Sequence, residues 1–137
     1  MNIRKYRTGD LSRIKNPLEP IPRDYPEQEP PESDFSYTLV DNQGNPLIVG
    51  GLIPQENGVH KIWIRIDQTV KTLMLVKLLM GILLVIREEF GSPLTLEANV
   101  LCYYPAGIRF AEWFGFRETG VKEENGFEFR TYQLCLN

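Results

Sequence analysis

Few side chains in this sequence can exchange protons near neutral pH. His60 is the only histidine, Asp67 follows a segment of alternating isoleucines, and Glu97 lies in a later apolar segment. Tyr103 and Tyr104 stand together before a proline and are weak acids. Their positions do not form a Ser-His-Asp set or a metal-binding set. The chemistry that these residue types could still perform is general acid–base catalysis.

The two cysteines, Cys102 and Cys135, are not arranged as a zinc site. Neither belongs to a Cys-x-x-Cys or Cys/His pattern. The pattern favours two buried, reduced thiols in a cytosolic protein, and it leaves a disulfide between them open. We therefore expect no metal site.

Length and composition are those of an ordinary globular protein. The 137 residues fit a single domain over 1–137, with 42% hydrophobic and 24% charged residues. The net charge of −3 argues against a nucleic-acid partner, because such binding usually requires a basic face. The most apolar segment, 73–86, is too short to span a bilayer and contains Lys77 and Gly81. We expect no membrane contact, no secretory signal and a cytoplasmic location.

An irregular arm is expected at 16–34, where prolines and acidic residues alternate. Because proline removes an amide donor and fixes φ, neither a helix nor a central strand can run through it. The prolines are Pro17, Pro20, Pro22, Pro26, Pro30 and Pro31, and the acidic residues are Glu19, Asp24, Glu27, Glu29, Glu32 and Asp34. Two interpretations stay open: a loop wrapped over the domain, or a docking segment for a partner protein.

The rest of the chain alternates between strand and helix patterns. Strands are expected at 3–6, 36–40, 46–53, 60–67, 94–100, 116–119 and 127–136, and helices at 69–89 and 105–114. A short helix should end near Ile14, capped by Thr8 or Asp10. Gly50 and Gly51 predict a bulge or a close backbone approach.

Two of these elements carry a clear pattern of burial. In the strand 60–67 the isoleucines share one face, and Lys61, Trp63 and Arg65 share the other. The helix 69–89 is apolar almost all round, so we expect it to pack against a sheet on one side and against something else on the other.

Two stretches resemble the GNAT superfamily, whose members transfer an acetyl group from acetyl-CoA to an amine. Ile3 to Leu11 is similar to the family's first strand and helix start, and Gly107 to Phe116 is similar to its closing signature, an apolar helix running into Gly-Phe. The resemblance implies an α/β (α+β) fold with a central mixed, mostly antiparallel twisted sheet flanked by helices. The run Trp113-Phe114-Gly115-Phe116 also resembles GNAT-like proteins of tailed bacteriophages.

The resemblance places an acetyl-CoA loop after the strand expected at 60–67. There the family carries Arg/Gln-x-x-Gly-x-Gly/Ala, whose glycines bring backbone amides to the cofactor's pyrophosphate. The corresponding residues here are Gln68, Thr69, Val70, Lys71, Thr72 and Leu73. Lys71 and Leu73 replace the glycines, and their side chains would obstruct that approach. The free amides of a helix N-terminus and the charge of Lys71 leave acetyl-CoA binding open.

The catalytic groups that the resemblance implies are only partly present. Many members place a general-acid tyrosine just before Glu-x-x-Gly-Phe, where this sequence has Ala111. Tyr103 or Tyr104 can substitute, or the two are ordinary junction aromatics. By analogy Asp67 is best placed as the general base, whereas His60 is expected to face solvent.

Two main functions follow from the resemblance. The altered loop favours a non-catalytic GNAT-fold protein with an interaction or structural role, with 16–34 as the candidate docking segment. The alternative is an acetyl-CoA-dependent N-acetyltransferase that acts on an amine through Asp67 and Tyr104. A CoA-type binder without transfer activity is a third possibility, and fold alone does not choose among them.

Overall fold

One seven-stranded sheet dominates the computed structural model, which describes all residues except 1, 22–24, 27, 32, 92 and 137. The strands are β1 (Asn2–Lys5), β2 (Ser36–Val40), β3 (Pro46–Pro54), β4 (Val59–Ile66), β5 (Leu94–Leu101), β6 (Arg117–Glu124) and β7 (Phe127–Leu136). The helices are α1 (Thr72–Phe90) and α2 (Pro105–Trp113), with short 3-10 turns η1 (Leu11–Arg13) and η2 (Glu56–Gly58). The predicted order of strands and helices is confirmed.

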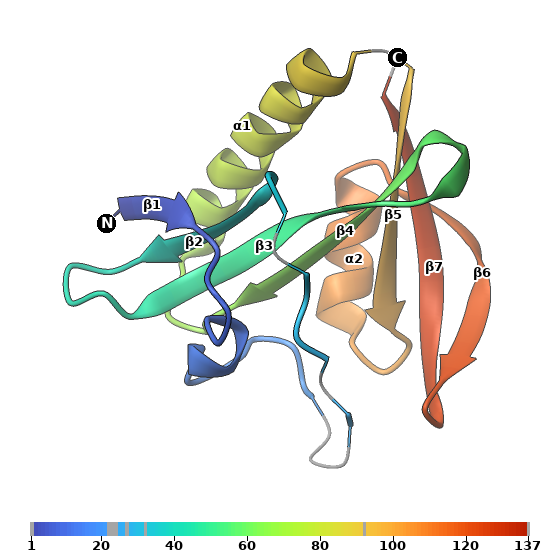
Figure 1. Ribbon diagram of the computed structural model, residues 1–137. Helices are drawn as coiled ribbons and strands as arrows, with labels where there is room; N and C mark the ends of the chain where they lie inside the picture. The colour runs from blue at the N-terminus through green and yellow to red at the C-terminus, as the bar shows by residue number, and fades with distance from the viewer. Residues whose placement is uncertain (1, 22–24, 27, 32, 92, 137) are drawn as a thin grey trace.

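The sheet has the order β1-β2-β3-β4-β5-β7-β6. Its neighbours pair antiparallel except β4 and β5, which are parallel and are connected through α1. The expected mixed, mostly antiparallel α+β sheet is therefore confirmed. The half made of β1 to β4 runs in a different direction from the half made of β5, β7 and β6 (Figure 1).

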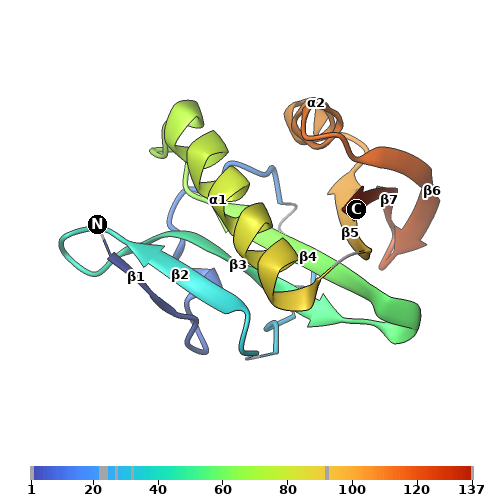
Figure 2. The same cartoon turned by 90° about the horizontal axis from the view of Figure 1, so that it is seen from above.

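Helix α1 covers one face of the first half of the sheet (Figure 2). The predicted isoleucine face of β4 points toward it: Ile62, Ile64 and Ile66 pack in the clusters that contain the buried residues of α1. Those buried residues are Leu75, Leu79 and Ile86, which recur at helical spacing. This confirms the predicted sheet-facing side of the helix.

The opposite face of the sheet has its own small core. Tyr6, Ile14 and Val49 are buried there with Trp63 packed against them. The Tyr6 and Trp63 rings meet edge to face, with centroids 5.4 Å apart. The residue that follows β1 and the end of η1 are thus fixed to the centre of the sheet.

Two local expectations change in the structure. The strand expected at 116–119 extends to Glu124, because positive φ angles at Asn125 (55°) and Gly126 (83°) confine the turn to these two residues. No bulge occurs at Gly50–Gly51, where pairing with β2 and β4 stays in register. The close approach is real: a Cβ on Gly51 would lie 2.8 Å from the Phe35 carbonyl oxygen.

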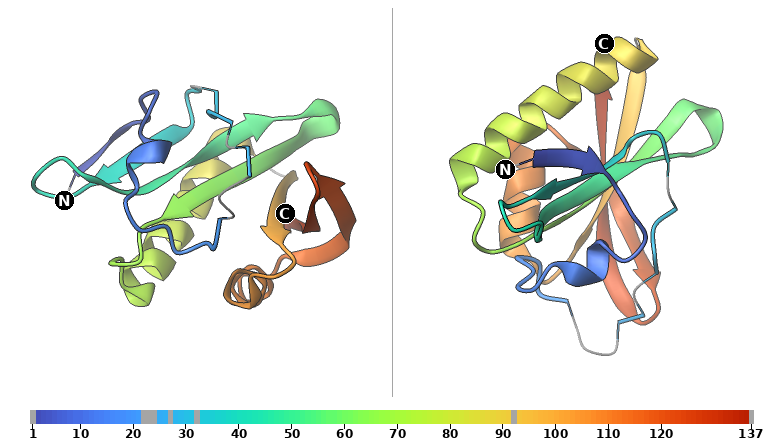
Figure 3. Two further views of the ribbon diagram at one scale, coloured as in Figure 1. Left: turned by 90° about the horizontal axis from the view of Figure 1, so that it is seen from below. Right: turned by 60° about the vertical axis from the view of Figure 1, so that its left-hand side comes forward.

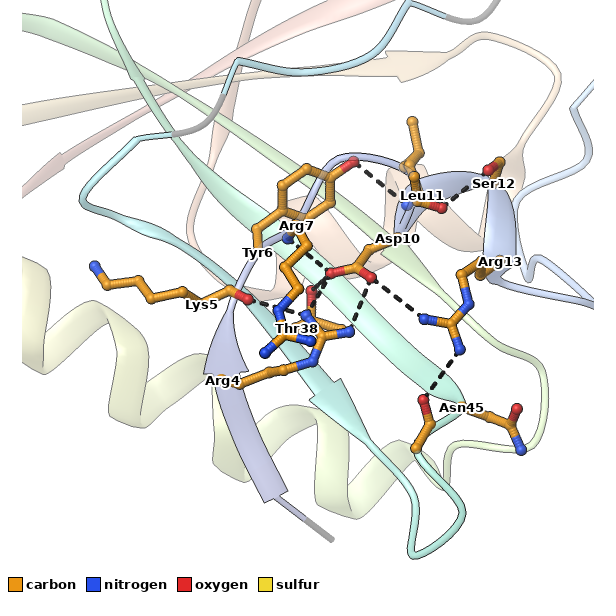
Figure 4. Close-up of polar contacts among 12 residues, drawn as sticks. Arg4, Lys5, Tyr6, Arg7, Asp10, Leu11, Ser12, Arg13, Thr38 and Asn45 are labelled. Atoms are coloured by element: carbon orange, nitrogen blue, oxygen red, sulfur yellow. Dashed lines mark hydrogen bonds and ion pairs between the residues drawn. The ribbon is translucent and has the colours of Figure 1, made fainter.

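Asp10 is a buried hub rather than the expected cap (Figure 4). It stands at the N-cap position of η1, yet its side chain makes no capping bond. Its carboxylate instead receives two bonds from the Arg4 guanidinium (2.7 and 2.9 Å) and one from the Thr38 hydroxyl (2.7 Å). The Arg7 amide adds another at 2.9 Å. The carboxylate therefore ties β1, the following turn and β2 together.

Burial of Asp10 opposes its ionisation, but the bonds from Arg4, the Arg7 amide and Thr38 outweigh it and hold the pKa at about 2. Because this pKa lies below the unfolded value of about 3.9, the ionised carboxylate stabilises the fold at neutral pH by about 2 kcal/mol. That stability is complete above about pH 4 and is lost as the pH falls toward 2.

Asp10→Asn should therefore lower the free energy of unfolding by about 2 kcal/mol at pH 7 and by about half of that at pH 3, because part of the linkage remains until the pH falls to the folded pKa. Urea unfolding at both pH values measures this difference. Asp34→Asn, which removes an exposed carboxylate, is the control and should leave the curves unchanged. An equal loss at both pH values for Asp10→Asn would contradict the linkage.

The glycines of β3 and α1 make a second test of the packing. Gly51→Ala should lower the free energy of unfolding by at least about 1 kcal/mol, because its Cβ would meet backbone at 2.8 Å. Gly81→Ala should raise it by about 0.5–1 kcal/mol, because open space surrounds that position and alanine favours helix. Chemical denaturation at low protein concentration compares the two, and changes of the same sign would refute this account.

Candidate functional site

The candidate site lies where β4 and β5 part. Their parallel ladder contains only the pairs Val59–Thr95, His60–Leu96 and Lys61–Glu97, although β4 continues to Ile66 and β5 to Leu101. Beyond Glu97 the two strands diverge, as Figure 1 shows below their crossing point. The residues that the sequence singled out at 67–73 and at 103–104 follow the divergent ends of these strands.

Aromatic residues of α2 and of its C-cap occupy the α1 side of this opening. Phe110 and Phe114 belong to the same apolar cluster as Ile64 and Ile66, and their two ring centroids are 4.9 Å apart. The divergence of the backbone is therefore filled with side chains on that face. The aromatic residues of the closing signature serve as core here.

The proline-rich arm supplies the other side of the opening. The Leu18 amide donates to the Ile66 carbonyl (2.7 Å), and the Gln68 amide donates to the Asn16 carbonyl (2.8 Å). These bonds form an antiparallel bridge between Pro17 and Asp67. The start of the arm therefore takes up part of the edge of β4 that β5 has left.

The arm also contacts the second half of the sheet and the N-terminal segment. The Tyr25 ring lies 5.2 Å from the Phe127 ring, at the start of β7. Glu29 accepts bonds from the Tyr6 hydroxyl and the Gly9 amide. In the two views of Figure 3 the described parts of the arm, drawn in blue, run beside both halves of the sheet. Of the two interpretations of the arm, a loop wrapped over the domain describes these contacts.

Asp67 is buried, with 5% of its surface exposed. Its carboxylate accepts bonds from the Thr69 amide (3.0 Å), the Thr69 hydroxyl (2.8 Å) and the Asn16 amide (3.2 Å). Burial alone would raise its pKa, but the bonds from Thr69 and Asn16 outweigh it and leave the pKa lowered. A carboxylate held in this way is a weak proton acceptor, and its role as general base stays a prediction.

The amides of the predicted cofactor loop are largely bonded within the protein. Those of Gln68 and Thr69 donate to Asn16 and Asp67, and the Val70 amide donates to the Asp67 carbonyl at 3.1 Å. The Gln68 side chain donates to the Pro17 carbonyl (3.2 Å). Each of these donors therefore already has an acceptor inside the chain.

The remaining loop residues begin α1. Lys71 is the N-cap in an extended conformation, and no side chain caps the helix. Helix geometry leaves the amides of the first turn, including those of Thr72 and Leu73, without intrahelical acceptors. The Leu73 side chain is 67% exposed, so it projects from the surface at this turn. Only this end of the predicted loop offers amides outward.

Tyr104 lies at the base of α2, where it is the N-cap residue. Burial raises its pKa, and the nearby charge of Glu19 in the arm adds to the shift. Its ring lies so close to Gly107 that a Cβ there would be 2.4 Å from the Tyr104 Cδ2 atom. Tyr103 is more exposed, at 47%. The arm thus reaches both Asp67 and Tyr104, through Asn16 and Glu19.

The other candidate groups lie elsewhere. His60 pairs with Leu96 in the closed part of the ladder, and its ring packs on Phe90 with centroids 4.6 Å apart. It is half-buried, so the expected solvent-facing position is wrong. Glu97 also lies in the closed part, opposite Lys61. The structure does not bring either residue into contact with Asp67.

Metal-binding groups and membrane-spanning helices are both absent from the described part of the chain. Among the described residues, no group of three or more His, Cys, Asp or Glu side chains is placed to hold a metal ion. Neither helix in the described part of the chain has the length and apolar run that a membrane crossing requires. Both cysteines are free; Cys135 is exposed and Cys102 is only partly buried, so the expectation of two buried thiols is wrong for both residues.

Comparison with solved structures identifies the fold. The ribosomal-protein-S18-alanine N-acetyltransferase from Escherichia coli aligns with a TM-score of 0.70 over 98% of this chain and 92% of its own, at 18% identity. The fold is GNAT-like. This confirms the fold that the resemblance implied.

Other GNAT-like structures align over a smaller share of the chain. The N-acetyltransferase from Staphylococcus aureus Mu50 has a TM-score of 0.59 and 18% identity, over 74% of this chain and 67% of its own. YncA from Salmonella typhimurium, solved with its cofactor acetyl-CoA, has a TM-score of 0.57 and 15% identity, over 74% of this chain and 64% of its own. No family model and no curated protein matches this sequence.

The contacts of Asp67 make a testable account of the site. Asp67→Ala should speed amide hydrogen exchange at Asn16 and Thr69 by at least about tenfold, because both amides lose their acceptor. Exchange measured by NMR reads each amide separately. Asp41→Ala is a matched control, because Asp41 accepts the Gln43 amide (2.8 Å) in a different turn. It should affect Gln43 and spare Asn16, and slow exchange at both sites in Asp67→Ala would contradict the account.

Proposed function

We propose that this chain is a non-catalytic protein with a GNAT-like fold, acting as an interaction or structural protein. The observation that carries the proposal is the bonding of the loop that follows β4. In the family that the sequence resembles, this loop presents amides to the pyrophosphate of acetyl-CoA. Here the amides of Gln68, Thr69 and Val70 donate to Asn16 and Asp67 instead. A phosphate would have to displace these internal bonds.

The arm supports the same proposal. Its main chain bonds the Ile66 carbonyl and the Gln68 amide, on the edge of β4 that borders the opening. A ligand lying along that edge would compete with Asn16 and Leu18 for the same groups. Lys71 and Leu73, where the family has glycine, follow directly after these bonded residues. Their side chains add bulk where the cofactor would need to approach the backbone. The residues present therefore do not fit the cofactor well.

The partner in this proposal is a protein, with the arm 16–34 as its docking segment. The exposed acidic residue Asp34 would favour a basic surface on that protein, whereas the Glu29 carboxylate already accepts bonds from Tyr6 and Gly9. The resemblance of Trp113-Phe114-Gly115-Phe116 to phage GNAT-like proteins would suit a structural role in a virion or in a host cytoplasm.

Isothermal titration calorimetry with acetyl-CoA tests the non-catalytic reading. We expect no measurable heat and no thermal shift up to millimolar cofactor, whereas YncA from Salmonella typhimurium, titrated in parallel, should bind. A dissociation constant in the micromolar range, about −8 kcal/mol, would overturn the proposal.

A second candidate, an acetyl-CoA-dependent N-acetyltransferase, rests on one observation. The N-terminus of α1 has no side-chain cap, and Lys71 stands beside its outward amides. Both features favour an anion. If this candidate is correct, release of free CoA in the presence of a primary amine should be detectable, and Asp67→Asn should slow it strongly. Absence of CoA release would remove the candidate.

A further inference from the structure

The side of α1 that faces away from the sheet is unusually apolar. Met80, Leu84 and Val85 have 54%, 63% and 59% of their surface exposed. With Gly81, they follow one side of the helix at helical spacing, opposite the buried Leu79 and its neighbours. This side of α1 meets no other element in the view from above (Figure 2). We call these exposed residues the outer face of α1.

Gly81 lies in the middle of the outer face. A Cβ at this position would meet nothing within 4 Å, so no contact inside the chain requires glycine. Glycine in a helix interior costs about 1 kcal/mol relative to alanine. What glycine permits is the close approach of a second backbone. The outer face thus has its smallest residue at the centre and larger apolar residues on both sides.

The charges on the outer face complete the pattern. Lys77 lies one turn before Gly81, and Glu88 lies one turn after Leu84. Both are exposed, and neither makes an ion pair with another described residue. Lys77 and Glu88 therefore lie toward opposite ends of the face, and the exposed Arg87 lies beside Glu88, on the side of the helix that lines the groove with Met80 and Leu84. Such a surface is complementary to itself when a second copy is turned end for end.

We propose that two copies of this protein pair through the outer faces of α1, antiparallel and about a two-fold axis that passes between positions 82 and 83. In this register Lys77 of each copy faces Glu88 of the other, and Gly81 faces Leu84. Met80 faces Val85. One register thus satisfies the charges, the size of the side chains and the two-fold symmetry.

A groove beside the outer face extends the contact. Met80 and Leu84 line it together with Trp113 of α2, which is 65% exposed, and its volume is about 370 Å³. The second copy would cover part of this groove. The second copy would then cover part of Trp113, a residue type that is enriched in protein interfaces. The pairing uses a different surface from the loop after β4 and does not depend on whether acetyl-CoA binds.

Sedimentation velocity of the full chain from about 1 to 500 µM, a range that brackets ordinary protein affinities, tests the pairing. The wild-type protein should pass from monomer to dimer. Leu84→Lys should weaken the dimer at least about a hundredfold, because it buries two unpaired charges at the centre. Val121→Lys, which changes an equally exposed residue on β6 (61%), is the matched control and should dimerise like wild type.

Charge reversal tests the register. Lys77→Glu or Glu88→Lys alone should raise the dissociation constant of the dimer at least about tenfold, since two attractive pairs become repulsive. The double variant Lys77→Glu/Glu88→Lys should recover wild-type affinity. Circular dichroism of each variant confirms that it is folded.

Three outcomes would overturn the proposal. They are a wild-type protein that stays monomeric over the whole range, a dimer that Leu84→Lys leaves intact, and a double variant no tighter than either single one. The first would exclude self-association at these concentrations. The second would place the dimer contact elsewhere. The third would exclude the antiparallel register.

Discussion

The main-chain pairing of β4 with β5 consists of three parallel residue pairs, from Val59–Thr95 to Lys61–Glu97. Beyond Lys61, the backbone N–H and C=O groups on this edge of β4 have no partner in β5. Where such groups are buried, they need other hydrogen-bond partners. The chain meets this constraint with its own segments. Phe110 and Phe114 fill the opening on the side of α1, and the main chain of the arm bonds Ile66 on the edge. The arm is therefore part of how the sheet is completed, although its sequence has no strand pattern.

The loop after β4 follows from the same constraint. An anion-binding loop has to direct its amides outward, and glycine makes the required conformations and the close approach accessible. In this chain the buried carboxylate of Asp67 gathers the amides of Thr69 and Asn16, and its carbonyl accepts the Val70 amide. A loop that bonds its own amides needs no glycine. The inward bonding of the amides thus explains why this loop can have Lys71 and Leu73 at the positions where the family has glycine.

Much of the fold could be predicted from sequence, because it depends on local patterns. The alternation of Ile62, Ile64 and Ile66 and the apolar spacing of α1 indicated correctly what faces what. What the sequence could not reveal were contacts between distant segments. Asn16 and Asp67 are 51 positions apart. Asp10 meets Thr38 28 positions away, so a residue that looked like a helix cap became a buried hub. The sequence signalled that the loop lacks glycine, but only the structure reveals where its amides are bonded.

The two surfaces at which α1 could contact another molecule differ in whether they contain glycine. At its N-terminus, where a cofactor phosphate would need bare backbone, the chain has the exposed side chain of Leu73. In its middle, where no cofactor is expected, it has Gly81 in open space. The sequence predicted that α1 would be covered on both sides, because its apolar residues run almost all round. The sheet covers one side only, and burying the other would remove exposed apolar surface from water. The structure therefore favours the close approach of another molecule at the outer face of α1 over the approach of a cofactor phosphate at its first turn.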